Sequence, residues 1–242
     1  MRRFFVENLA DLIKIKTDFY PFPKEIEHRL SSVLRMKDGD QFELIDGNGL
    51  ILETAYHTNK NKSGFSILNS HTEEKPSASQ IDLAVSIIRR ERFELIIEKA
   101  VELGVSNLYP MYSEHSKPYG HESAKKLQER WQKIADQALS QCRRAFRCLV
   151  HEPQDIGSLD SIRSGSDIVI ALHPGYESFQ NNSLSLKNSK LLLLVGPEGG
   201  FSENDISIIK SISAKIFSLN TSILRTETAA IYMLSVINHS LL

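Results

Sequence analysis

The spacing of apolar residues along the chain changes at about residue 72. The first part contains two short strand-like runs, Phe42–Ile45 and Leu50–Tyr56, separated by Asp46-Gly47-Asn48-Gly49. These four residues are typical of a hairpin turn, because glycine and asparagine tolerate a positive φ. Residues 23–36 have the apolar spacing of a helix that begins after a proline. This part therefore predicts a small, mostly β module.

A polar stretch at residues 69–79, rich in helix and strand breakers, is interpreted as a linker. Beyond it, continuous apolar runs alternate with stretches of helical spacing. The runs are Ile81–Ile88, Val105–Met111, Asp167–Leu172 and Leu191–Val195, and the helical stretches are Phe93–Leu103 and Ala124–Cys142. Strands that are apolar on both faces and alternate with helices are typical of an α/β domain with a parallel sheet. The sequence therefore predicts two domains, residues 1–72 and 73–242.

Three of the predicted strand ends carry unusual loops. They are Leu172-His173-Pro174-Gly175, Gly196-Pro197-Glu198-Gly199-Gly200, and the segment from Leu219 to Thr228. Ligands of parallel α/β sheets bind beyond the carboxyl ends of the strands, and glycines let the backbone approach a ligand closely. Although the glycine loop alone would equally fit a tight strand-to-helix connection, three such loops favour a ligand site.

A helix is expected directly after the glycine loop. Ser202 and Asp205 resemble a capping box, which marks a helix start. The free N–H groups of that start could hold a carboxylate or a phosphate.

Composition and charge narrow the possible functions. The chain has 242 residues, 41% of them hydrophobic and 24% charged, and a formal net charge of −1. It therefore lacks the global basic field of a non-specific nucleic-acid binder. Cys142 and Cys148 form no CxxC pair, and the histidines form no ligand pattern, so no metal is predicted. Neither a membrane-spanning run nor a signal-peptide core is recognised, so a cytoplasmic location is expected.

The glycine loop does not match common nucleotide motifs. The pattern GxxxxGK[ST] is absent, and Gly47-Asn48-Gly49 lacks the third glycine of a dinucleotide fingerprint. Glu198 within the loop disfavours a triphosphate and permits a ligand with a positive centre. The residues alone leave the ligand open at this point.

Read together, several motifs resemble one family. Leu193–Ser202 (LLVGPEGGFS), Ile223–Ala229 (ILRTETA) and Glu98–Val105 (EKAVELGV) are similar to segments of the RsmE methyltransferases. These S-adenosylmethionine enzymes of the SPOUT class methylate N3 of a uridine in 16S ribosomal RNA. The resemblance implies an N-terminal PUA-like β-barrel and a C-terminal α/β domain with a mostly parallel sheet and a deep trefoil knot. It also implies a homodimer that acts on the small ribosomal subunit.

The resemblance assigns roles to individual residues. The expected S-adenosylmethionine-binding residues are Leu172, His173, Pro174, Gly196, Pro197, Glu198, Gly199, Gly200, Leu219, Asn220, Ile223, Leu224 and Thr226. The expected RNA-binding residues are Arg2, Arg3, Arg35, Arg89, Arg90, Arg143 and Arg144, and the expected catalytic residues are Arg225 and Glu227. Two positions depart from the family pattern: Asn220 stands where glycine is usual, and Cys148 where proline is usual.

Most of these side chains also have a structural interpretation. Glu227 could be a general base or could stabilise the N-terminus of the last helix. Glu198 could face the positive sulfur of the cofactor or shape its loop. Arg225 could fix the uridine or a phosphate, or form a buried ion pair. His173 could be a base or could shape the turn before Pro174.

Local charge provides the expected RNA contacts. Basic residues outnumber acidic ones between residues 120 and 150, and Arg89, Arg90 and Arg92 form a second basic cluster. Together they predict a phosphate-contacting track. Two alternatives to the RsmE activity remain open: methylation of another RNA, and a non-catalytic RNA-binding or ribosome-assembly role, which the departure at Asn220 would favour.

Overall fold

The computed structural model describes residues 1–15, 17–59, 62–75, 80–116, 123–180, 188–219 and 222–241. The chain divides into two compact units. The first unit comprises Met1–Lys75 and Leu139–Arg147, and the second comprises Pro76–Ala138 and Cys148–Leu242. The division after Lys75 lies inside the stretch that the sequence marks as a linker. The return of Leu139–Arg147 to the first unit is not predicted by any feature of the sequence.

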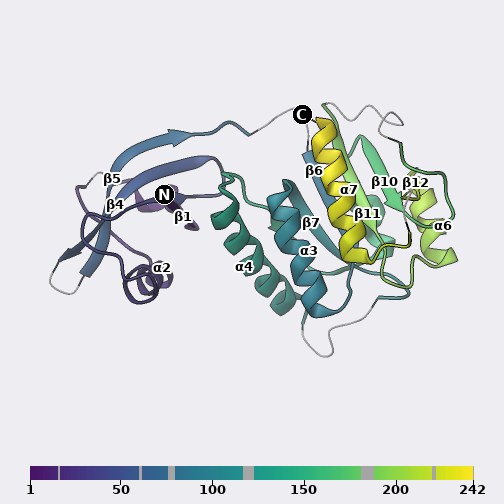
Figure 1. Cartoon of the computed structure of the whole chain (residues 1–242), viewed down its shortest axis with the longest axis horizontal. Coiled ribbons are helices and arrows are strands. Elements are labelled where there is room, and N and C mark those ends of the chain that lie inside the picture. The colour runs from purple at the N-terminus through teal and green to yellow at the C-terminus, as the bar shows by residue number, and fades with distance from the viewer. Residues whose placement is uncertain are drawn as a thin grey trace. The chain divides into compact units, whose positions relative to one another are not determined.

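The first unit is built on a five-stranded sheet in the order β1-β3-β4-β5-β2, of which Figure 1 labels β1, β4 and β5. The strands are β1 (Arg2–Phe5), β2 (Tyr20–Pro21), β3 (Gln41–Ile45), β4 (Leu50–Asn59) and β5 (Lys62–Thr72). β1 and β3 are parallel, and the other pairs are antiparallel. The edge strands β1 and β2 do not pair with each other, and β2 has only two residues with which to form a ladder. Within the described residues the sheet is therefore open, and the expected closed barrel is not found.

Short elements in this unit follow local sequence signals. In the hairpin between β3 and β4, the Asp46 carboxylate accepts hydrogen bonds from the N–H groups of Asn48 (2.7 Å) and Leu50 (3.0 Å), as the turn signal predicts. The helical spacing of residues 23–36 produces α2 (Lys24–His28) and a π-helical turn, η1 (Arg29–Val33), while α1 spans Leu9–Leu12. β5 continues to Thr72, so the first residues of the expected linker are strand.

The second unit contains a parallel sheet in the order β12-β10-β11-β6-β7-β8, with β9 also paired to β7. The strands are β6 (Gln80–Ser86), β7 (Val105–Tyr112), β8 (Leu149–Val150), β9 (Gln154–Asp155), β10 (Ile168–Leu172), β11 (Lys190–Val195) and β12 (Lys215–Phe217). Every pairing in this sheet is parallel. The predicted α/β domain with a parallel sheet is therefore confirmed.

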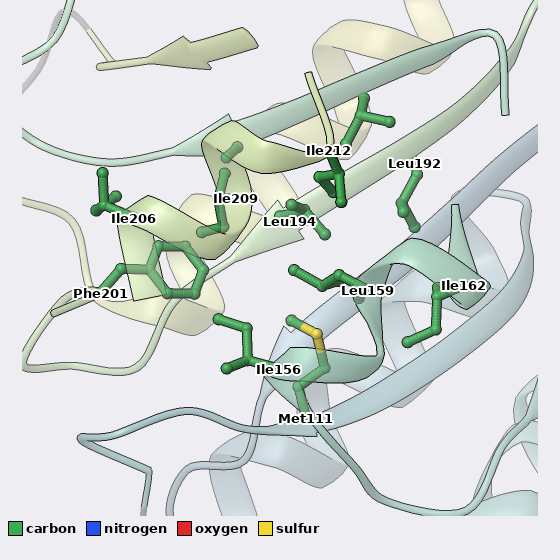
Figure 2. Close-up of a cluster of buried hydrophobic side chains, with 13 residues drawn as sticks. Met111, Ile156, Leu159, Ile162, Leu192, Leu194, Phe201, Ile206, Ile209 and Ile212 are labelled. Carbon is green, nitrogen blue, oxygen red and sulfur yellow. The ribbon is translucent and has the colours of Figure 1, made fainter. Parts of the chain in front are cut away.

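Helices cover this sheet on both faces. They are α3 (Arg90–Glu102), α4 (Ala124–Cys142), α5 (Leu159–Ile162), α6 (Glu203–Ser211) and α7 (Thr226–Leu241), with the 3₁₀ turn η2 at Ile156–Ser158. α3 and α7 pack against each other, α3 against β7 and α7 against β11 (Figure 1). Figure 2 shows the other layer, in which Leu192 and Leu194 of β11 meet apolar side chains of α5 and α6. The central strand is thus buried on both faces, which explains its continuous apolar run.

None of the helices in the described part of the chain is both long and apolar enough to cross a membrane. Within the same residues, no group of three or more histidine, cysteine, aspartate or glutamate side chains is placed to hold a metal ion.

Candidate functional site

A pocket of about 310 Å³ lies at the carboxyl ends of β10, β11 and β12 in the second unit. It is lined by Leu172, His173, Pro174, Gly175, Val195, Gly196, Pro197, Glu198, Gly200, Ser218, Leu219, Ser222, Ile223, Leu224, Thr226 and Ala229. The parallel sheet brings these segments together, because the carboxyl ends of its strands lie at one edge. The three unusual loops of the sequence therefore line a single concave site.

The glycine loop after β11 is a tight turn fixed at both ends. The Gly200 N–H donates to the Pro197 carbonyl oxygen at 2.9 Å, and Gly200 has a φ of +76° that favours glycine. A Cβ added at Gly196 would lie 3.1 Å from the Phe201 ring. Figure 2 shows that this ring points into the core beside Ile209. Because glycine has no side chain, the loop can begin at position 196 in close contact with the buried Phe201 ring.

Backbone hydrogen bonds join the other two loops to each other. The His173 N–H donates to the Phe217 carbonyl oxygen at 2.9 Å, and the Phe179 N–H donates to the Ser218 carbonyl oxygen at 2.9 Å. The Ser218 hydroxyl donates to the Tyr176 carbonyl oxygen at 2.8 Å. These bonds hold the loops after β10 and β12 side by side, so the two lining segments form one wall.

His173 is bonded through both ring nitrogens. Nδ1 lies 2.6 Å from the Pro174 carbonyl oxygen and Nε2 lies 3.2 Å from the Phe201 carbonyl oxygen. A neutral imidazole carries one N–H, so it can donate to only one of these two carbonyl oxygens, and the tautomer decides which. Both nitrogens face backbone carbonyl oxygens of the fold. This geometry favours the interpretation of His173 as a turn-shaping residue.

Arg92 in the first turn of α3 connects two carboxylates. Its Nη1 lies 2.5 Å from Glu198 Oε1, and its Nε lies 3.7 Å from Glu227 Oε1. Glu198 lines the pocket, whereas Arg92 and Glu227 do not. The sequence places Arg92 only in a basic cluster with Arg89 and Arg90. Its position just after the carboxyl end of β6, in the first turn of a helix, is the one sequence signal that could have identified it.

Glu227 is buried near the start of α7, with 8% of its surface exposed. Its Oε2 has no hydrogen-bond partner among the described residues, and no backbone N–H there donates to its carboxylate. Glu227 is therefore not a hydrogen-bonding cap, although its charge is still favoured in the first turn of α7. A buried carboxylate oxygen without a partner is costly, so this oxygen calls for a partner from outside the described residues.

Arg225 is exposed, and it forms no ion pair with any carboxylate in the described part of the chain. The alternative that it forms a buried ion pair is therefore wrong. Arg225 belongs to the loop that precedes α7. Because no carboxylate of the described residues pairs with its guanidinium, this group is available to a bound molecule.

Other expectations fit the structure less well. The start of α6 has the predicted capping box, but Asp205 is buried there and its carboxylate accepts from the Ser202 N–H at 3.0 Å. A buried carboxylate leaves no place for an anion, so the expected anion site at this helix is not found. Gly199 does not line the pocket, because its Cα faces the His115 side chain. Asn220 lies outside the described residues.

The expected RNA-binding arginines differ in their exposure and in whether they bond to other residues. Arg3 pairs with Glu43 at 2.7 Å, with 9% of its side chain exposed, and also donates to the Arg143 carbonyl oxygen. This geometry supports a structural role for Arg3. Arg2, Arg35 and Arg143 of the first unit and Arg89 of the second unit are exposed, whereas Arg90 and Arg144 are partly buried.

Comparison with known proteins places these features in a family. A model of the RNA methyltransferase domain matches residues 74–238. Ribosomal RNA small subunit methyltransferase E of Bacillus subtilis is 28% identical over 251 residues, covering 99% of this chain and 96% of that protein.

Solved structures give the same result. The crystal structure of a ribosomal RNA small subunit methyltransferase E from Neisseria gonorrhoeae bound to S-adenosyl methionine has a TM-score of 0.85 at 25% identity, covering 100% of this chain and 98% of that one. A putative methyltransferase from Legionella pneumophila in complex with the same cofactor has a TM-score of 0.85 at 26% identity, covering 99% and 98%. Because the family model spans well over half of its residues, the chain belongs to the RNA methyltransferase family, and these relatives confirm its resemblance to the RsmE group.

Proposed function

We propose that this protein methylates N3 of a specific uridine in 16S ribosomal RNA of the small ribosomal subunit, with S-adenosylmethionine as the methyl donor. The observation that carries the proposal is the single pocket lined by the glycine loop and by the segment Ile223–Thr226. These are the two motifs that resemble the RsmE family most specifically. The Bacillus subtilis relative that bears this name matches almost the whole chain.

The residues of the pocket fit this cofactor. Val195, Ile223 and Leu224 provide apolar surface suited to a purine ring, while the glycine backbone permits close approach. Glu198 contributes a carboxylate suited to a ligand with a positive centre. S-adenosylmethionine, when bound, supplies an activated methyl group on its positively charged sulfur.

The chain's own task is to prepare the uridine. N3 carries a proton and lies on the Watson–Crick edge, so the base must be unpaired and the proton removed. Glu227 accepts that proton through its buried Oε2, which forms no hydrogen bond in the described residues, and it directly follows Thr226, which lines the pocket. Arg225, exposed on the loop directly before α7, binds the uridine or an adjacent phosphate. Correct positioning of the two reactants then supplies a large part of the rate enhancement.

The finer architecture is part of the same proposal. The three pocket loops form the trefoil knot expected for the SPOUT class, and the first unit is a PUA-like RNA-binding module whose sheet is open in the described residues. Two copies form a homodimer. Exposed apolar side chains on the second unit support the dimer: Ile223 is 89% exposed, and Tyr232 of α7 and Leu95 of α3 are also exposed.

RNA binding is assigned to the exposed arginines of each unit. In the first unit these are Arg2, Arg35 and Arg143, with Arg144 partly buried, and in the second unit Arg89, with Arg90 partly buried. Arg3 is retained only as the residue that fixes Arg143 through its carbonyl oxygen. The substrate is cytoplasmic ribosomal RNA, so we place the protein in the cytoplasm.

The test is transfer of labelled methyl groups from S-adenosylmethionine to small ribosomal subunits that lack the modification. Mass spectrometry of the RNA then locates the product. A single N3-methyluridine in 16S RNA supports the proposal, whereas a product in another RNA would support the alternative substrate. The absence of any product, with RNA still bound, would support the assembly-factor role instead.

A further inference from the structure

Arg92 is placed unusually for an arginine of a surface cluster. It lies in the first turn of α3, where the positive end of the helix dipole disfavours a cation. Its side chain is 31% exposed and contacts two carboxylates that belong to separate segments of the second unit. The helix start alone would select an acidic residue here, so the arginine is explained by its carboxylate partners.

The two carboxylates have different surroundings. Glu198 lines the pocket and has 27% of its side chain exposed, whereas the Glu227 side chain is 11% exposed. The guanidinium meets one oxygen of Glu227, and the second oxygen is buried without a partner among the described residues. Arg92 therefore determines which oxygen of Glu227 is left for another group.

We propose that Arg92 is a positioning residue for methyl transfer, holding the carboxylates of Glu198 and Glu227 through one guanidinium. The proposal rests on the proposed function, because it assumes that the second oxygen of Glu227 accepts the N3 proton of the uridine. Arg92 itself does not line the pocket, so it acts through the two carboxylates and not directly on the uridine. Its planar fork presents separate nitrogens, Nη1 and Nε, to the two carboxylates in a fixed relative geometry, whereas the ammonium of a lysine is a single point charge.

The proposal predicts different effects of Arg92 on the rate of methyl transfer and on the affinity for the cofactor. Without the guanidinium, Glu198 retains its charge beside the pocket, so a positively charged cofactor is still attracted. Glu227 loses the contact that orients it, and misplacement by about 1 Å can reduce a rate by roughly a hundredfold. Removing Arg92 should therefore reduce the rate of the bound complex much more than the affinity for the cofactor.

The test compares Arg92→Gln, Arg92→Lys and Lys99→Gln. Lys99 is the matched control, because it is a cation of the same helix that pairs with Glu98 and Glu102 and does not line the pocket. Calorimetry gives the dissociation constant of S-adenosylmethionine, and single-turnover assays on undermethylated small subunits give the transfer rate. Arg92→Gln should slow transfer by about a hundredfold while the dissociation constant changes by less than about threefold. Arg92→Lys should recover about a tenth of the wild-type rate, and Lys99→Gln should transfer at the wild-type rate.

A double variant tests whether the two side chains act as a unit. Arg92→Gln combined with Glu227→Gln should be no slower than Glu227→Gln alone, because groups that act together are not additive. Full additivity, or an Arg92→Gln protein as active as Lys99→Gln, would overturn the proposal. So would a loss of activity that is matched by loss of cofactor affinity and of melting temperature. Wild-type protein that transfers no methyl group would contradict the proposed function itself, and this proposal with it.

Discussion

The two sheets of this protein use arginine in opposite ways. In the first unit, Arg3 of β1 pairs with Glu43, its direct neighbour on β3, and the ion pair is partly buried, with 9% and 15% of the two side chains exposed. In the second unit, Arg92 joins carboxylates from two segments that no strand register brings together. The first arginine stabilises a sheet, whereas the second lies next to a pocket. An arginine's role therefore follows from where its partners lie.

Sheet topology explains the difference. The strands of the first unit are mostly antiparallel, so successive loops alternate between the two ends of the strands. In the second unit every strand runs the same way, and the loops after β10, β11 and β12 all leave from one edge. Parallel order collects loops into a site, and antiparallel order disperses them.

The largest expected effect concerns the ion pair of the first unit. Arg3→Ala would leave the Glu43 carboxylate nearly buried without its partner, and we expect a loss of about 3 kcal/mol in the free energy of unfolding of this unit. Chemical denaturation followed by circular dichroism measures it. The double variant Arg3→Ala/Glu43→Ala should be more stable than Arg3→Ala alone. If the single variant is as stable as wild type, Arg3 does not stabilise the sheet of the first unit, and the difference drawn between Arg3 and Arg92 is wrong.

The next effect concerns the exposed arginine beside the pocket. Arg225→Ala should slow methyl transfer by roughly tenfold to a hundredfold, or about 1.4–2.7 kcal/mol, by removing a contact to the bound RNA. The melting temperature should not change, because Arg225 contributes no ion pair in the described structure. Arg163→Ala is the control, since Arg163 is a partly exposed arginine of the same unit that pairs with Asp160 and donates to the Ile212 carbonyl oxygen instead. Equal activity of both variants would remove Arg225 from the site.

A pair of glycine variants separates backbone strain from site geometry. Gly39 in the first unit and Gly200 in the second have φ angles of +86° and +76°, and an added Cβ at Gly39 meets no other atom within 4 Å. Alanine at either position should destabilise its unit by about 1–2 kcal/mol. Only Gly200→Ala should also weaken S-adenosylmethionine binding, by about tenfold or less, as measured by calorimetry. Weakened binding in Gly39→Ala would show that the two units are coupled.

The smallest effect is a pH dependence within the second unit. His151 stacks on Tyr109 at 4.2 Å and its Nε2 lies 3.2 Å from Asn107 Oδ1. Burial lowers the pKa of His151, and the nearby Asp82 carboxylate opposes that shift. The neutral ring therefore contributes stability above its ordinary pKa, and this is lost as the pH falls through the lowered pKa.

A His151→Gln variant isolates that contribution. Between about pH 7.5 and 5 the wild type should lose more melting temperature than the variant, by a few degrees at most, since about 1 kcal/mol corresponds to roughly 2–4 °C in a chain of this size. Thermal denaturation in matched buffers measures the difference. Parallel curves for the two proteins would mean that His151 titrates alike in the folded and unfolded chain.

Local features of the molecule could be predicted from the sequence. The apolar runs Ile81–Ile88 and Leu191–Val195 correspond to β6 and β11, and Ala124–Cys142 is α4 with the expected bounds. The hairpin turn at Asp46 and the capping box at Ser202 also form as expected. Each of these depends on neighbours within a few residues, so the chain's own periodicity and turn chemistry determine them.

The candidate site was predictable only in part. The loops that line the pocket carry their own glycines and prolines, so they could be located from the sequence, and a parallel sheet brings them to one edge. Arg92 and Glu198 are 106 residues apart, and no local pattern connects them. The return of Leu139–Arg147 to the first unit and the open edge of the five-stranded sheet also depend on distant segments. Local sequence patterns predict the elements and the loops. The partners of each side chain depend on tertiary packing, because such contacts join segments that are brought together only in the folded chain.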